Sequence, residues 1–222
     1  MTTFPQYCTA LCLKALEDGS FHPGCPNAED HKRSKFTLEA VIGDVLESVR
    51  NLHVKVVGGG NSAKCVAVRS DSYGHGLIVK LYNEETEQYL YERELEVYHH
   101  LSELQGVYVP VILGAVDAPM GSYSRMIIMS YGGVPLHHCT PNDELIDELA
   151  KAAIAICAHG IFLDDNSTDN LLVNDNKVAV IDFESAFIVE PPSPAALERY
   201  KAEIEGVAEK VRISGNLRAL LP

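Results

Sequence analysis

The sequence predicts a mixed α+β protein, with helices first, then a run of strands, then a second helical region. Three patterns support this fold class. Apolar residues at three- and four-residue spacing, as in 36–52, are typical of one face of an amphipathic helix. From Val54 the pattern changes to short apolar strands with glycine between them. Helical spacing returns in 141–158 and 195–213, and two short apolar runs lie between these helices.

Composition limits the classes of function. A chain of 222 residues with 46% hydrophobic residues can form one large or two small domains with an apolar core. The formal net charge of −13 argues against a broad surface for nucleic acid or anionic membranes. No run approaches the roughly 18 uninterrupted apolar residues of a membrane span, and the first residues lack the pattern of a secretory signal. We therefore expect a cytoplasmic protein that binds neither nucleic acid nor membrane.

Six cysteines are scattered along the chain: Cys8, Cys12, Cys25, Cys65, Cys139 and Cys157. Their spacing favours reduced, buried thiols over a disulfide framework. The first three, with His22 and His31, could in principle gather around a metal. Because no CxxC pair is present, a zinc site is the less favoured interpretation.

The most informative stretch runs from residue 158 to residue 186. Apolar runs at 171–173 and 178–181 flank a polar turn, which predicts a short β-hairpin. We expect the polar residues at the ends of this hairpin to lie close enough to act on one ligand. They are Asp165, Asn170 and Asp182.

Upstream, 54–57 and 64–68 read as strands on either side of a glycine-containing turn. Glycines allow a backbone to approach phosphate closely, although such a turn is more often only a hairpin connection. The strand 76–82 carries Lys80 among apolar neighbours, so its stem is expected to be half-buried. A buried ammonium needs a partner, and the helical segment 84–104 offers several glutamates.

In this order the motifs resemble those of the protein-kinase-like superfamily. The matching features are a glycine-rich loop, a strand lysine, a helix glutamate, a buried strand leading into a hinge, D-x-x-x-x-N and I-D-F. The form Ile-Asp-Phe-Glu at 181–184 is similar to that of aminoglycoside- and choline-kinase-like phosphotransferases and of small fungal kinase-like proteins. The short stretch after Ala186 is similar to that of minimal RIO-type kinases.

The resemblance implies a two-lobed protein-kinase-like fold with a truncated, mostly helical C-lobe. Residues 1–53 would form an N-terminal helical extension that precedes the resemblance. Residues 54–133 would form the N-lobe with the glycine-rich loop and the hinge. Residues 134–222 would form the shortened C-lobe with the catalytic loop.

The resemblance also implies ATP and Mg²⁺ as cofactors and assigns roles to residues of this sequence. The phosphates would lie against Gly58, Gly59, Gly60 and Lys80. Lys80 would pair with Glu94, for which Glu92 and Glu96 are the alternatives. The adenine would bind the hinge, at Ser130, Tyr131 and Gly132. Mg²⁺ would be held by Asn170 and Asp182, while Asp165 would position the acceptor hydroxyl.

Two departures from the family pattern leave alternatives open. Leu163-Asp164 stands before Asp165, where the family has a histidine that braces the catalytic loop, and Ala63 replaces the third glycine. The favoured function is transfer of the ATP γ-phosphate to a hydroxyl of a protein or a small molecule. The alternative is a pseudokinase that binds a nucleotide or a partner without turnover. A structural module without nucleotide is a third hypothesis.

Overall fold

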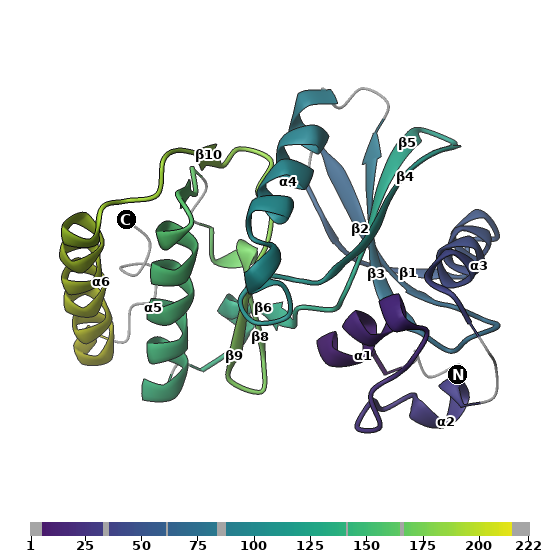
Figure 1. Cartoon of the computed structure of the whole chain (residues 1–222), viewed down its shortest axis with the longest axis horizontal. Helices are drawn as coiled ribbons and strands as arrows, with labels where there is room; N and C mark the ends of the chain where they lie inside the picture. Colours follow the sequence, from purple (N-terminus) through teal and green to yellow (C-terminus); the bar gives the residue numbers. More distant parts are fainter. Residues whose placement is uncertain are drawn as a thin grey trace. The chain divides into compact units, whose positions relative to one another are not determined.

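The computed structural model describes residues 6–32, 36–60, 62–83, 88–140, 142–164 and 167–214. The chain divides into two compact units (Figure 1). Unit 1 consists of Met1–Gln88 and Val111–Tyr131, and unit 2 consists of Tyr89–Pro110 and Gly132–Pro222. Helices and strands occur in both units, which confirms the predicted mixed α+β class.

Unit 1 is built on a five-stranded antiparallel sheet with the strand order β1-β2-β3-β5-β4. The strands are β1 (Val54–Gly59), β2 (Ala63–Arg69), β3 (Gly76–Asn83), β4 (Ile112–Met120) and β5 (Tyr123–Met129). The central strand β3 is buried along almost its whole length, as its run of apolar residues predicts.

Among the described residues, four helical segments precede this sheet in the sequence. They are α1 (Ala10–Lys14), η1 (Ala15–Asp18), α2 (Ala28–His31) and α3 (Leu38–Arg50). The predicted amphipathic helix is confirmed as α3, which begins at the N-cap Thr37 and buries Val41, Val45 and Val49. The segment that links η1 to α3 contains the one-turn helix α2. Buried residues of 8–49 share one apolar core with β2, β3, β4 and β5.

Unit 2 is mostly helical and has two small sheets. Its elements begin with α4 (Gln88–His100), whose first residue lies in unit 1, and continue with η2 (Ser102–Leu104), β6 (Val134–Pro135), η3 (Leu136–His138), α5 (Asp143–Ala158), β7 (Ile161–Phe162), η4 (Thr168–Asn170), β8 (Leu171–Asn174), β9 (Lys177–Val180), β10 (Phe187–Ile188) and α6 (Pro194–Ser214). One sheet has the order β6-β8-β9, and β7 pairs with β10. Helix α5 packs on both α6 and β9 (Figure 1).

The predicted β-hairpin is confirmed as β8 and β9, with bounds that differ from the prediction by one residue. Its two-residue turn, Asp175 and Asn176, has positive φ at both positions (50° and 60°). Asp and Asn tolerate this conformation better than other non-glycine residues, and it suits the twist of a tight hairpin. The turn chemistry that the sequence shows therefore fixes the register. None of the helices in the described parts of the chain is long and apolar enough to cross a membrane.

Candidate functional site

The glycine turn of unit 1 is short and exposed. Gly58 and Gly59 end β1, and the N–H of Gly60 donates to the carbonyl of Ala63 at 2.9 Å. Gly59 has a φ of +150°, and a Cβ there would lie 2.9 Å from the carbonyl oxygen of Ala63. Only glycine fits this close approach without strain. Position 61 lies outside the described residues.

Lys80 lies in the middle of β3, between Cys65 of β2 and Ile127 of β5. The residue is only 8% exposed, so it is more deeply buried than the half-buried stem that the sequence predicts. Its ammonium nitrogen lies 5.3 Å from the ring centroid of Tyr82, within the range of a cation–π contact.

The three predicted hinge residues have different surroundings. Ser130 is buried and forms two hydrogen bonds with Val111. Its N–H donates to the Val111 carbonyl, and its hydroxyl accepts from the Val111 N–H, each at 2.9 Å. Its amide is therefore already used. The ring of Tyr131 stacks on Tyr7 with a centroid distance of 3.8 Å. Gly132 lies against the β8–β9 hairpin, and a Cβ there would meet Leu172 Cδ1 at 2.8 Å.

In unit 2, the ends of the hairpin bring two predicted residues together. Asn170 ends η4 directly before β8, and Asp182 follows β9 after one residue. The N–H of Ile181 donates to the carbonyl of Asn170 at 2.9 Å, so the two segments are joined next to Asp182. Asn170 is buried and Asp182 is half-buried.

Asp182 has a φ of +69°, which is uncommon for a residue with a side chain. Two further carboxylates lie beside it. Glu94 of α4, Asp182 and Glu184 each offer an oxygen, and these oxygens lie within 4.8 Å of one another. Glu94 is fully buried and Glu184 is half-buried. Carboxylate oxygens are the ligands that Mg²⁺ takes in proteins, so this carboxylate group fits that ion.

Sequence reasoning did not single out Glu184 as a site residue. The sequence offered no strand or helix pattern that would place Glu184 beside Asp182, because the chain leaves β9 after Val180 and turns at Glu184. Of the three glutamates considered as partners of Lys80, Glu94 is fully buried, whereas Glu92 and Glu96 are exposed.

An aromatic contact fixes α4 against the segment that carries Asp182. The rings of Tyr98 and Phe183 meet edge to face, with a centroid distance of 5.2 Å and an interplanar angle of 85°. Both side chains are buried. Tyr98 lies one turn after Glu94 on α4, and Phe183 directly follows Asp182, so this contact holds the two carboxylates near each other.

The predicted catalytic Asp165 lies outside the described residues. Leu163, where the family has histidine, lines an apolar cavity of about 130 Å³ together with residues of α5, α6 and the β8–β9 hairpin. Another histidine, His137, contacts the segment that leads into the hairpin. The Nδ1 of His137, in η3, lies 2.7 Å from a carboxylate oxygen of Asp169, the neighbour of Asn170.

Comparison with known proteins gives a matching family and a similar relative. Residues 53–160 match the phosphotransferase enzyme family (APH). The chain is also similar to the meiotic driver SPOK2 of Podospora anserina. The two are 28% identical over an alignment 219 residues long, which covers 87% of this chain and 28% of that protein. It therefore spans less than a third of the length of this relative. Over residues 53–160 the chain is similar to phosphotransferase enzymes of the protein-kinase-like superfamily, and this confirms the resemblance to that superfamily.

Proposed function

We propose that this protein is an ATP-dependent phosphotransferase that moves the γ-phosphate of ATP to a hydroxyl of a protein or a small molecule. The observation that carries the proposal is the carboxylate group of Glu94, Asp182 and Glu184, together with Asn170 at the same end of the hairpin. The family match ends at residue 160, before three of these four residues. The two-lobed architecture with a truncated C-lobe is part of the same proposal.

The proposal assigns binding of the ATP phosphates to the glycine turn and to Lys80. Exposed backbone at Gly58 to Gly60 lets a polyanion approach closely, because no side chain stands in front of it, although the Gly60 N–H itself donates to the Ala63 carbonyl. Lys80 is buried in unit 1 and Glu94 is buried in unit 2. The pairing of Lys80 with Glu94 is part of the proposal as what the resemblance implies.

Asp182 and Asn170 would hold Mg²⁺, with Glu184 as a further candidate ligand from the carboxylate group. When bound, Mg²⁺ would neutralise charge on the phosphates. Asp165 would accept a hydrogen bond from the acceptor hydroxyl and orient its oxygen toward the γ-phosphate. The hinge residues Tyr131 and Gly132 would offer backbone groups to the adenine, because the Ser130 N–H is bonded to Val111.

Thermal unfolding with ATP, with and without Mg²⁺, tests nucleotide binding. Ligand at 100 times its dissociation constant stabilises by about 2.7 kcal/mol. Since about 1 kcal/mol moves the Tm of a chain of this size by about 2–4 °C, we expect a Mg²⁺-dependent rise of about 5–11 °C. Asp182→Asn should lose this rise, because Asn tolerates the positive φ of +69° but carries no charge.

Asp175→Asn is the matched control. Asp175 has the same side chain and also a positive φ of 50°, but it lies exposed in the β8–β9 turn. It should keep the full shift with Mg²⁺ and ATP. If wild type and both variants shift equally, Asp182 does not hold the ion and the assignment of the metal site is wrong.

Asp165→Ala tests the transfer step separately from binding. The rate at which labelled γ-phosphate is hydrolysed to inorganic phosphate or transferred to the protein itself should fall by a factor of about 10² or more. The thermal shift with Mg²⁺ and ATP should remain, because the proposal gives Asp165 no contact with the metal. Unchanged turnover in this variant would remove Asp165 from the mechanism.

The alternative function is a pseudokinase, and one observation favours it. Leu163 lines an apolar cavity, so no histidine braces the catalytic loop from this position. A wild-type chain that gives the Mg²⁺-dependent shift but no γ-phosphate release above that of Asp165→Ala would support this alternative.

A further inference from the structure

Four potential metal ligands of the N-terminal extension meet inside unit 1. They are Cys8, Cys12, Cys25 and His31, called here the Cys₃His cluster. Each offers one ligand atom, and all four atoms lie within 4.8 Å of one another. All four residues are buried, at 5% exposure or less, and none of the cysteines is in a disulfide. We propose that the Cys₃His cluster is a structural zinc site.

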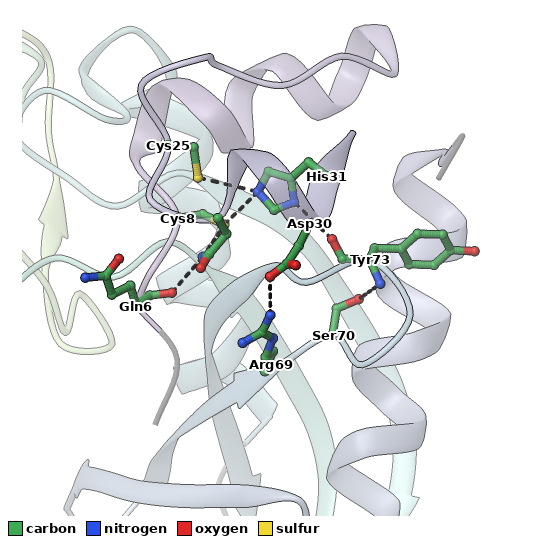
Figure 2. Close-up of polar contacts among 9 residues, drawn as sticks. Gln6, Cys8, Cys25, Asp30, His31, Arg69, Ser70 and Tyr73 are labelled. Carbon is green, nitrogen blue, oxygen red and sulfur yellow. Dashed lines mark hydrogen bonds and ion pairs between the residues drawn. The ribbon is translucent and has the colours of Figure 1, made fainter. Parts of the chain in front are cut away.

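The distances fit a tetrahedral ion. With Zn–S of about 2.3 Å and Zn–N of about 2.0 Å, tetrahedral geometry puts a thiolate sulfur about 3.5 Å from an imidazole nitrogen. The sulfurs of Cys8 and Cys25 each lie 3.4 Å from Nε2 of His31 (Figure 2). Two of the six edges of the coordination tetrahedron are therefore already near their expected length.

The orientation of His31 also points to a metal. Its Nδ1 lies 2.9 Å from the carbonyl oxygen of Tyr73 and must carry a proton to donate to it. This leaves Nε2 to face the sulfurs, as Figure 2 shows for Cys25. Metal-binding histidines are held in this way, with the second ring nitrogen donating to a carbonyl. Two sulfurs converge on a nitrogen that has a single lone pair, and one ion would satisfy all three atoms.

Local structure explains how the ligands converge. Cys8 lies just before the N-cap Thr9, whose hydroxyl accepts from the Cys12 N–H at 3.2 Å, so both thiols lie at the start of α1. Cys25 precedes the one-turn helix α2, which ends at His31. The side-chain amide of Asn27 donates to the Cys8 sulfur at 3.4 Å. Such N–H···S contacts offset the negative charge of three thiolates around a dication.

The ligand set selects zinc and a structural role. Thiolate and imidazole are ligands that zinc prefers in tetrahedral sites, whereas Mg²⁺ and Ca²⁺ take oxygen. Four buried protein ligands leave no open position for a substrate, which distinguishes a structural site from a catalytic one. The sequence argument against zinc relied on the missing CxxC pair. The observed spacing Cys8-x₃-Cys12 lies within the range of known zinc sites.

The site would fasten the extension to the β2–β3 turn. Besides the bond from His31 to Tyr73, the Cys8 N–H donates to the Gly76 carbonyl at 3.1 Å. Asp30, the neighbour of His31, forms an ion pair with Arg69 at the end of β2 (Figure 2). Zinc would therefore hold the chain before α3 against the strand that carries Lys80. This inference does not depend on phosphotransfer.

The first test counts metal in the full chain, purified under reducing conditions without chelator. Elemental analysis should find about one zinc ion per chain, and Cys25→Ser and His31→Ala should each lower this to less than about a tenth. Cys157→Ala is the matched control, because Cys157 is equally buried but lies in α5 of unit 2. It should keep the full zinc content.

A second variant guards against simple misfolding. His31→Cys keeps a zinc ligand, so it should retain the metal, and Co²⁺ exchanged into it should show a tetrahedral spectrum that differs from wild type in its thiolate bands. A folded wild-type chain without zinc, or with a disulfide among the three cysteines, would overturn the proposal. So would a zinc content that is unchanged in both Cys25→Ser and His31→Ala.

Discussion

At the scale of single residues, Asp182 combines a positive φ with a carboxylate in a group of three. A non-glycine residue in this region is strained unless its surroundings hold it there, and such residues concentrate where a ligand is bound. The hydrogen bond from Ile181 to Asn170 holds the backbone just before it. This hydrogen bond between the two ends of the hairpin helps to hold Asp182 in its unusual conformation.

Tyr200 gives a residue-scale prediction on the pH dependence of stability. Burial raises its pKa to about 12, and the charges of Cys157 and Glu203 act in the same direction. In the unfolded chain a tyrosine titrates near 10. Between these values the folded chain keeps a proton that the unfolded chain has lost, so the free energy of unfolding should fall as the pH rises from about 10 to about 12.

The measurement is denaturant unfolding at several pH values in this range. Tyr200→Phe should show a shallower loss of stability, because it removes the group that titrates. Tyr89→Phe is the control, since Tyr89 lies on α4 with 59% of its surface exposed, and it should follow wild type. Equal slopes in all three proteins would contradict the assigned role of Tyr200.

At the scale of elements, α3 offers a stabilising substitution. Gly43 lies in the middle of this helix, and a Cβ built there would meet nothing within 4 Å. Because glycine is about 1 kcal/mol worse than alanine in a helix interior, Gly43→Ala should raise the free energy of unfolding by about 0.5–1 kcal/mol. Calorimetry should show a Tm higher by about 1–4 °C.

Gly76→Ala should have the opposite sign, although the added group is the same. A Cβ on Gly76 would lie 2.6 Å from the carbonyl oxygen of Gln6 and 3.1 Å from Cα of Tyr7. Both are backbone atoms, so the segment before Cys8 must move away from β3. We expect a loss of about 1–3 kcal/mol in the same calorimetric experiment. A gain in stability would show that this segment does not pack as described.

The elements that sequence predicts well are those that local chemistry determines. The hairpin of β8 and β9 follows from two apolar runs and an Asp-Asn turn, and α3 follows from its apolar spacing and its N-cap Thr37. Helix α2 could not be predicted in this way, because four residues form too little local structure to be stable by themselves. It forms where His31 is bonded to Tyr73, which is distant in sequence.

The same distinction applies to the candidate site. Asn170 and Asp182 could be predicted, because a hairpin brings its two ends together. Glu184 could not, since its neighbour Glu94 comes from another element. A metal site at the cysteines and His31 of the Cys₃His cluster was only the less favoured interpretation of the sequence, because the folded chain alone shows that they meet. The role of Asp165 stays a prediction that the transfer experiment must test.

At the scale of the whole molecule, charge is the dominant feature. A formal charge of −13 and an isoelectric point near 5.0 mean that negative groups repel one another across the surface at neutral pH. This repulsion destabilises the compact state more than the unfolded chain, in which the charges lie farther apart.

Salt should therefore stabilise the protein at neutral pH. Raising the NaCl concentration from about 10 mM to about 150 mM shortens the Debye length from about 30 Å to about 8 Å, which screens the repulsion between separated surface charges. We expect the Tm at pH 7.5 to rise by a few degrees over this range. At a pH near 5.0 the net charge is close to zero, so the same change in salt should have little effect. If the Tm rises equally at both pH values, salt acts through specific ion binding or apolar burial, and repulsion between the charges is not what limits the stability of this protein.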